Sequence, residues 1–568
     1  MYRNSKHTVI FPLLLAAGVV LGLLLGQFMG RNSAESQLRG ILTRLTQPDN
    51  KLNYTLSLIE NRYVDSVSMD SLVEHVIPLV TRELDPHSVY IPASEMQALN
   101  EPLEGEFDGI GVVFNMATDT VIVLNVIPSG PSDKAGVRAG DRIIEIDDSL
   151  VAGRKLPQND VVRMLRGPRG TKVKLSLGRQ GISGLVDAEV VRDAIPIKSI
   201  ESAFVIVDGI GYVKLSQFAR TSHAELLLAL ARLRSEGAER LIFDLRGNSG
   251  GYLDQAISIA NEFLHEGQLI VYTEDRAHRQ ERQYADGRGS AQEIEVAVLI
   301  DEGSASSSEI LAGALQDNDR GTIIGRRSFG KGLVQQQIPY SDGSALRLTT
   351  ARYFTPTGRS IQKPYTIGDD EAYEEDIWNR YRNNEFFSAD SIRFADSLKR
   401  VTPGGKVVYG GGGIMPDIFV PNDTSGITSY YINVANAGLL QKFAFDYVDA
   451  NRDKFEGVQT VGELETLLPA DDTLLRQFVN FASRNGVSAR WYYINISHDL
   501  IVNQLKGLIA RDVLGYTAYF SIVNRMDATV SKAVEELLGG GASFPITVAG
   551  NGGTPADSIA AETPKTVK

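Results

Sequence analysis

The chain contains no cysteine among its 568 residues. This absence excludes disulfide bonds, thiolate metal sites and cysteine nucleophiles. It does not assign a compartment, because exported bacterial proteins and cytosolic proteins both occur without cysteine. A repeat of the solenoid type is also absent.

Positive charge is not in excess either. The sequence has 57 Lys and Arg residues and 70 Asp and Glu residues, so the net charge is -13. A general nucleic-acid surface is therefore not expected, and we expect no nucleic acid among the partners. The composition that remains, 43% hydrophobic and 22% charged, is typical of a globular protein. At this length we expect several domains.

A long uncharged run occupies the N-terminus. It extends from Thr8 to Gly30 and follows Arg3 and Lys6. A bilayer is crossed by about 20 apolar residues, and flanking cations favour a cytoplasmic N-terminus with an exported body. No small-residue cleavage site follows the run before Arg31, so we expect residues 1–34 to be an uncleaved anchor. A cleaved signal peptide is the alternative.

The periodicity of apolar residues divides the rest of the chain. We expect a helical region at 35–103, short alternating strands at 104–190, alternating strands and helices at 191–424, a second helical region at 425–538 and a disordered tail at 539–568. The βα alternation predicts an α/β layer with a mostly parallel sheet. The charged stretch 366–400 is expected to be a solvated insertion.

Four serines stand where a predicted strand, 296–300, turns into a predicted helix that ends near Gln316. They are Ser304, Ser306, Ser307 and Ser308. Serine is a favoured N-cap, but a cap requires one serine. A helix start also provides free N–H groups and a positive dipole end, which suit a developing oxyanion. An exposed nucleophile is therefore the second interpretation of this segment.

Lys331 lies between Gly330 and Gly332 at the start of a predicted strand. Leu333, Val334 and Ile338 are expected to be buried, so the lysine should be partly desolvated. Its free pKa is about 10.4, and burial can lower it toward the roughly 7–8 that a base needs near neutral pH. No histidine lies between the serines and Lys331, so the pair favours a Ser–Lys dyad over a surface lysine.

Two other motifs compete with this dyad. The segment 325–332 nearly matches a phosphate-binding loop, but Gly332 replaces the hydroxyl that would hold magnesium, and a strand follows in place of a helix. The segment 247–251 matches G-x-S-x-G between a predicted strand and helix, with Ser249 as the serine. A triad would need His265, His278 or His498, none of which has a distinctive setting.

The segment from Gly109 to Val112 opens the unit of short strands. Its glycines could merely be flexible. Successive amides there could also bind the carboxylate of a peptide C-terminus, and the following AGVRAGDRIIEIDD pattern favours this interpretation.

Together these residues resemble the carboxy-terminal processing peptidases, also called tail-specific proteases, over roughly residues 50–420. The S-A-S-S-S-E-I, F-G-K-G and D-L-R-G-N-S-G-G segments carry the resemblance, with support from L-D-P-H-S at 84–88 and G-G-I-M-P-D at 412–417. The resemblance implies a crotonase-like α/β protease core with an inserted PDZ domain. It does not extend to the helical region beyond about residue 425.

The resemblance also assigns site residues. It implies Ser306 as nucleophile, Lys331 as general base, Gln335 as the glutamine bonded to that lysine, and Asp317 in a supporting role. Ser307 stands where the family usually has alanine, and its hydroxyl is a rival to Ser306. The implied oxyanion donors are the amides of Gly250, Gly251 and Ser307, and the implied carboxylate-binding loop is Gly109, Ile110, Gly111 and Val112.

The function that follows is a serine endopeptidase of the bacterial cell envelope, anchored in the inner membrane and facing the periplasm or the exterior. We expect it to bind unstructured apolar C-terminal tails through the PDZ domain and to cleave through an acyl-enzyme, with no metal or cofactor. A homo-oligomer is a further expectation whose size the residues do not set. A non-catalytic PDZ scaffold and a Ser-His-Asp esterase are the alternatives.

Overall fold

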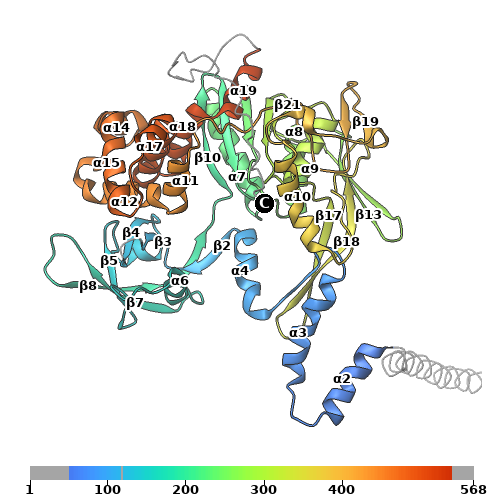
Figure 1. Ribbon diagram of the computed structural model, residues 1–568, viewed down its shortest axis with the longest axis horizontal. Coiled ribbons are helices and arrows are strands. Elements are labelled where there is room, and N and C mark those ends of the chain that lie inside the picture. Colours follow the sequence, from blue (N-terminus) through green and yellow to red (C-terminus); the bar gives the residue numbers. More distant parts are fainter. Residues whose placement is uncertain (1–49, 117–118, 540–568) are drawn as a thin grey trace, which may run out of the picture. The chain divides into compact units, whose positions relative to one another are not determined.

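The computed structural model of the chain describes residues 50–116 and 119–539, and it divides the chain into two compact units, Met1–Glu83 and Leu84–Lys568 (Figure 1). The predicted anchor at Thr8–Gly30 and the predicted tail at 540–568 lie outside the described residues. Within the described ranges, no helix combines the length and the apolar character needed to cross a bilayer.

The described part of the first unit consists of two helices, α2 (Lys51–Arg62) and α3 (Met69–Arg82). Asn50 and Ser68 cap them, because each side chain accepts a hydrogen bond from the amide three residues on. The helical character expected for this stretch is confirmed.

Within the second unit, a small antiparallel domain follows β1 (Val89–Ile91) and α4 (Ala93–Glu104). Its sheet has the order β3 (Val112–Asn115), β4 (Val121–Val126), β5 (Arg142–Ile146), β7 (Lys172–Gly178) and β8 (Leu185–Val191), with β6 (Ser149–Leu150) paired to β5. Helices α5 (Pro131–Lys134) and α6 (Gln158–Leu165) accompany the sheet. Val121, Ile143 and Val173 are fully buried in its core. Because β3 is the first strand in this order, among the described residues it has a neighbouring strand, β4, on one side only.

A six-stranded sheet forms the centre of the α/β region. Its order is β10 (Ile200–Val207), β11 (Ile210–Leu215), β12 (Arg240–Asp244), β15 (Glu295–Ile300), β16 (Thr322–Gly325) and β21 (Ile418–Phe419). All neighbours run parallel except β10 and β11, in agreement with the expected mostly parallel sheet. The carboxyl ends of β12 and β15 therefore meet at one edge, which is where ligands bind in such sheets.

Helices cover both faces of this sheet. On one face, α7 (Ser222–Ser235), α8 (Leu253–Phe263) and α9 (Ser307–Asp317) pack against the larger core cluster, which contains Phe243, Val298 and Leu311. On the other face, Val530 and Val534 of α19 (Ala528–Leu537) pack with Tyr212 and Ile242. The helix α19 falls within the region predicted to be helical, 425–538, but the sequence did not predict that it covers the second face of this sheet.

A second, antiparallel sheet was not anticipated from the sequence. It has the order β1 (Val89–Ile91), β18 (Ala345–Phe354), β13 (Leu269–Asp275) and β14 (Gln280–Tyr284), and β17 (Leu333–Pro339) pairs with β18. The expectation that Ile338 is buried is wrong, because its side chain is 41% exposed where β17 runs out toward solvent. Leu333, next to the lysine, is buried as expected.

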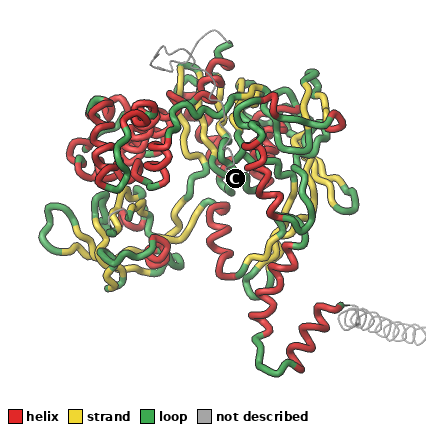
Figure 2. Tube along the Cα trace, viewed as in Figure 1, coloured by secondary structure: helices red, strands yellow, loops and turns green. Residues whose placement is uncertain are grey.

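Two further regions complete the unit. Residues 366–400 contain α10 (Asp370–Arg382), and the prediction that this charged stretch is merely solvated is wrong, because Tyr373 and Arg380 are buried. The C-terminal region is helical (Figure 2) and packs around Phe443, Phe478 and Leu505. Its helices are α11 (Ser429–Asn436), α12 (Leu439–Ala450), α13 (Arg452–Phe455), α14 (Val461–Leu467), α15 (Asp471–Arg484), α16 (Trp491–Ile496), α17 (His498–Leu514) and α18 (Tyr516–Val523).

Candidate active site

Ser306 occupies the residue before helix α9, directly after the turn that follows β15. Its backbone has φ 53° and ψ −114°, a region that side-chain-bearing residues rarely adopt. Such a conformation costs about 1–3 kcal/mol and persists only where the surroundings impose it, which is common at functional sites. The turn between the buried strand β15 and the buried helix α9 therefore holds Ser306 in a strained conformation.

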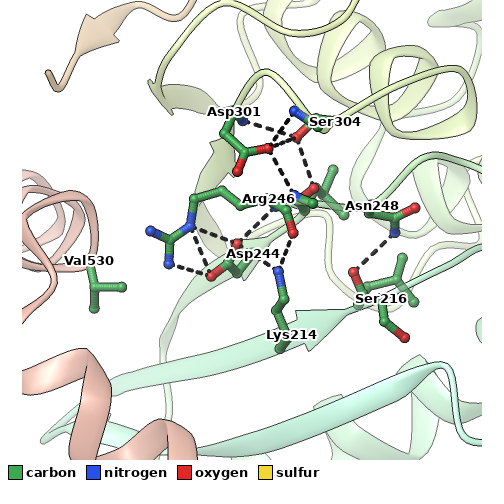
Figure 3. Close-up of polar contacts among 12 residues, drawn as sticks. Lys214, Ser216, Asp244, Arg246, Asn248, Asp301, Ser304 and Val530 are labelled. Carbon is green, nitrogen blue, oxygen red and sulfur yellow. Dashed lines mark hydrogen bonds and ion pairs between the residues drawn. The ribbon is translucent and has the colours of Figure 1, made fainter. Parts of the chain in front are cut away.

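The three neighbouring serines all support the turn. Their hydroxyls donate to main-chain carbonyls: Ser304 to Leu245 at 2.9 Å, Ser307 to Gly251 at 3.0 Å and Ser308 to Asn248 at 2.8 Å (the Ser304 contacts are drawn in Figure 3). The Ser306 hydroxyl donates to no carbonyl among the described residues, and Ser306 lines a cavity of about 490 Å³. Ser307 is buried and does not line this cavity.

Lys331 lines the same cavity from the loop that enters β17. Its pKa lies below the usual value, mainly because burial disfavours the ammonium and further because the Arg347 charge repels it. Glu309 and Asp85 oppose this shift. A lysine with a lowered pKa supplies more neutral amine near neutral pH, as a general base requires.

Glu309 joins the serine and lysine segments, and it is not among the site residues predicted from the sequence. Its carboxylate accepts hydrogen bonds from the amides of Ser306 at 2.9 Å, Gly330 at 2.7 Å and Lys331 at 2.8 Å. The Ser328 hydroxyl donates to it at 2.5 Å. Burial raises the pKa of Glu309 to about 7 against these donors. Its spacing after Ser306 matches a capping box, which is the signal that could have found it.

Tyr353 of β18 makes a second bridge. Its hydroxyl lies 3.1 Å from the carbonyl oxygen of Ser306 and 2.5 Å from that of Lys331. The side chain is 1% exposed, so the hydroxyl has little access to water. The main chains at Ser306 and Lys331 are therefore tied together on both their N–H and their C=O sides.

The glycine pair after β12 lies against Ser306. A Cβ atom on Gly250 would come within 2.8 Å of the Ser306 Cβ atom and 3.0 Å of the Ser307 nitrogen. The Gly250 amide donates to the Asn248 side chain at 2.9 Å. Among the described residues, the amides of Gly251 and Ser307 have no such acceptor and remain available for an oxyanion.

Gln335 lines the cavity beside Lys331, but its hydrogen bond in this structure goes to Thr349 at 3.2 Å and not to the lysine. Thr349 in turn donates to Asp85 at 2.9 Å. The neighbouring His87 approaches Tyr373 at 3.0 Å, and burial together with the Lys331 charge lowers the pKa of His87 to about 4. The L-D-P-H-S segment thus supports β18 behind the lysine.

Asp317 lies outside the cavity. It ends α9, eleven residues after Ser306, which at 1.5 Å per residue places it about 16 Å away along the helix. Its carboxylate accepts from the Arg359 guanidinium at 2.6 Å and from the Thr357 hydroxyl at 2.7 Å, and the ion pair is buried. The structure therefore gives Asp317 a part in holding the fold and no contact with the candidate reacting groups.

Ser249 also lines the cavity and is exposed, but no histidine is among the residues that line it. His265 and His278 are exposed, and His498 contacts Asp499 in the C-terminal helices. The G-x-S-x-G alternative therefore lacks its base. Within residues 50–116 and 119–539, no group of three or more His, Asp and Glu side chains is arranged to hold a metal ion.

The predicted carboxylate-binding loop joins β2 (Glu106–Gly109) to the edge strand β3. Gly111 has φ 74°, and the carbonyls of Ile110 and Gly111 accept hydrogen bonds from Ser132 and Ile127 at 3.0 Å. The amides of Ile110 and Gly111 have no acceptor among the described residues. Two adjacent amides at the end of an edge strand are the arrangement that a peptide C-terminus requires.

Three parts of the chain match protein-family models. Residues 209–372 match Peptidase family S41, residues 122–179 match a PDZ domain, and residues 430–515 match a family of unknown function. The matched ranges contain both Ser306 and Lys331. The predicted carboxylate-binding loop at Gly109–Val112 precedes the matched PDZ residues.

The relatives with similar sequences are processing proteases. The carboxy-terminal-processing protease of Bartonella bacilliformis is 38% identical over 338 residues, which cover 59% of this chain and 76% of that protein. For the carboxy-terminal processing protease CtpA of Bacillus subtilis, the identity is 34% over 314 residues, with 55% and 66% covered. Among solved structures, the photosystem II D1 C-terminal processing protease is 26% identical, covers 67% of this chain and 89% of its own, and gives a TM-score of 0.35.

The family-model and sequence matches confirm the predicted family and favour a peptidase over a non-catalytic scaffold. Homologues of this kind are bacterial processing enzymes. The chain is a multidomain α/β protein with a protease domain and a PDZ domain, and it belongs to the carboxy-terminal processing proteases, which are serine-type peptidases.

Proposed function

We propose that Ser306 is the nucleophile and Lys331 the general base of this peptidase. One observation carries the proposal: Ser306 and Lys331 line one cavity, and Glu309 and Tyr353 hold their main chains together. The lowered pKa of Lys331 supports its role as a base, since only the neutral amine can accept a proton.

The reaction proceeds by acyl transfer. Neutral Lys331 takes the proton of the Ser306 hydroxyl as the serine oxygen attacks the substrate carbonyl carbon. The carbonyl oxygen becomes an oxyanion that the amides of Gly251 and Ser307 stabilise. Loss of one such donor typically costs about 3–4 kcal/mol of barrier. Protonated Lys331 returns its proton to the departing amine, and the acyl-enzyme forms.

Water completes the cycle. Lys331, neutral again, takes a proton from the water molecule that attacks the Ser306 ester, and the carboxylic acid product leaves with the serine hydroxyl restored. Gln335 borders the cavity beside Lys331, with its side chain bonded to Thr349. Asp317 acts only on the fold, through Arg359.

The PDZ domain binds the C-terminal tail of the substrate. An unstructured apolar C-terminal tail adds to β3 as a further strand, and its carboxylate binds the amides of the Gly109–Val112 loop. Among the described residues, the amides of Ile110 and Gly111 donate to no acceptor and β3 has a neighbouring strand, β4, on one side only, which supports this binding mode. The chain upstream of the tail then enters the protease cavity.

We extend the proposal to the domain limits and the location. Residues 104–190 serve as the PDZ unit, 191–424 as a crotonase-like core and 425–538 as a helical region, while residues 1–34 anchor the protein in the inner membrane with its body outside the cytoplasm. The uncharged run at Thr8–Gly30 supports the anchor. N-terminal sequencing of the mature protein tests it, because a start beyond Gly30 would mean that the run is removed.

The dyad is tested with a quenched fluorescent peptide that ends in Ala-Val. We expect Ser306→Ala and Lys331→Ala each to abolish cleavage, and Ser249→Ala to retain most of it. Mass spectrometry of the products identifies the cleaved bond, and a serine-directed acylating probe should label the wild type but not Ser306→Ala. An inactive Ser249 variant beside an active Ser306 variant would refute the assignment.

A further inference from the structure

The charged side chain of Arg246 fixes the turn between β12 and the glycine pair, Gly250 and Gly251. The Arg246 guanidinium binds Asp244 through Nε at 3.0 Å and through Nη2 at 2.6 Å. Its remaining nitrogen, Nη1, donates to Asp527 at 2.8 Å. Figure 3 shows Arg246 lying over Asp244, with its guanidinium on the side where Val530 of α19 lies. The chain positions of Arg246 and Asp527 differ by 281 residues.

Asp527 is fixed by the helix that it caps. One carboxylate oxygen accepts hydrogen bonds from the amides of Thr529 at 2.9 Å and Val530 at 3.0 Å, while the other oxygen binds Arg246. Val530 and Val534 bury the helix against the central sheet. The carboxylate therefore has a position set by a packed element and not by a flexible surface side chain.

On the other side of Arg246 the main chain runs directly to the candidate oxyanion amides. Gly247 donates to Asp301 at 2.8 Å, and the Asn248 carbonyl accepts from Ala305 at 3.0 Å. The Asn248 side chain accepts from Gly250. A shift of Arg246 would therefore move the turn that carries Gly251 relative to Ser306.

Both cations of this cluster bind Asp244, and Arg246 has a second carboxylate partner in Asp527. Lys214 and Arg246 are the cations, Asp244 and Asp527 pair with them, and Glu201 lies close enough to interact with Lys214 and Asp244. The side chain of Asp244 is 1% exposed and that of Arg246 is 18% exposed. Without Asp527, Arg246 would share Asp244 with Lys214 and its Nη1 would lose the carboxylate it now binds, which is costly for a largely buried charged group.

We propose that Asp527 is a positioning residue for the peptidase reaction. Through Arg246, the C-terminal helix α19 holds the Asp244–Gly251 turn so that the Gly251 amide faces the oxyanion. The proposal rests on the function given above, and it assigns a role to a residue that lies outside the ranges matched by the peptidase, the PDZ domain and the family of unknown function. Asp527 does not contact the substrate.

The test is Asp527→Asn in the full-length chain, because asparagine caps a helix as well as aspartate but cannot pair its charge with Arg246. We expect kcat on the Ala-Val peptide to fall about tenfold, with KM within about twofold, as for an interaction that acts only in the transition state. Asp527→Glu should recover part of the loss. Thr460→Ala is the matched control, because it removes the cap of α14 without touching the turn.

A merely structural role predicts a different pattern. Thr460→Ala should then lower kcat as much as Asp527→Asn at equal loss of Tm, and the inference would be overturned. It would also fail if Asp527→Asn kept the wild-type kcat, or if Asp527→Asn and Arg246→Met reduced kcat additively in a double-mutant cycle. Ser306→Ala in the same assay separates the two proposals, since an active Ser306→Ala enzyme would refute the dyad itself.

Discussion

The serine and the lysine reach the same cavity with different kinds of support. Ser306 lies in a turn whose bonds come largely from its own neighbours and from the adjacent strand end, as the Ser304 and Ser308 contacts show. Lys331 follows a loop whose carbonyls are held by a distant helix: Arg380 of α10 donates to the Ser328 carbonyl at 2.7 Å and to the Phe329 carbonyl at 2.9 Å.

The support differs because Ser306 lies at the start of a helix, whereas Lys331 lies in an irregular loop. A helix start supplies its own geometry, because the first amides and the dipole are present in every helix. A loop that carries a lysine has no such geometry, so it depends on side chains that satisfy its main-chain groups from elsewhere. We therefore expect changes on the lysine side to act over longer sequence distances than changes on the serine side.

Replacing Glu309 should have the largest effect, because this carboxylate serves both segments. In Glu309→Ala, the amides of Ser306, Gly330 and Lys331 lose their buried acceptor, and each unsatisfied group costs about 1–3 kcal/mol. We expect activity to fall by about 100-fold or more and the Tm to drop, as measured by peptide cleavage and thermal unfolding. Near wild-type cleavage by a folded Glu309→Ala enzyme would show that the two segments do not need their common anchor.

Arg380→Met should have a smaller effect that is confined to the lysine segment. The loss of two bonds to the Ser328 and Phe329 carbonyls, together with the Asp376 ion pair, should lower kcat about tenfold with little change in KM. Arg382→Met on the same helix is the control, since Arg382 is exposed. Ser308→Ala is the serine-side counterpart, and a loss of kcat equal to that of Arg380→Met would contradict the difference between the two sides.

The smallest effect should come from the charge of Arg347. This cation helps to keep the pKa of Lys331 low, and activity requires the neutral amine, so activity rises with pH through that pKa. In Arg347→Gln the Lys331 pKa should rise, and the ascending limb of the pH profile of kcat/KM should move to higher pH. Arg347→Lys keeps the charge and should leave the profile in place. A shift to lower pH in the glutamine variant would exclude Lys331 as the group that titrates.

Much of the fold follows from local patterns in the sequence. The strand predicted at 296–300 is β15, which begins one residue earlier, and the helix predicted to end near Gln316 is α9, which ends at Asp317. Ser306 and Lys331, which line one cavity, could be proposed from the sequence because each lies in a short motif. Hydrophobic periodicity and turn residues are properties of adjacent positions, so one chain is enough to detect them.

The supporting residues could not be predicted in this way. Tyr353 lies 47 positions from Ser306, Arg380 lies 52 positions from Ser328, and Asp527 lies 281 positions from Arg246. Nothing in their local sequence distinguishes a buried partner from a solvated side chain. Local sequence also could not show that residues 366–400 are more than a solvated insertion. Their acidic helix α10 carries two buried residues, Tyr373 and Arg380, that nothing in the neighbouring sequence marks as buried.

Gly250 has no side chain, and this limits how the site can be studied by mutagenesis. Even alanine there would place a methyl group 2.8 Å from the Ser306 Cβ atom, so the proposed nucleophile would have to shift. Every Gly250 variant would therefore report crowding of the serine and not the contribution of the peptide group. Only a main-chain change, such as an amide-to-ester replacement made by chemical ligation, would isolate the hydrogen-bond donors of this turn.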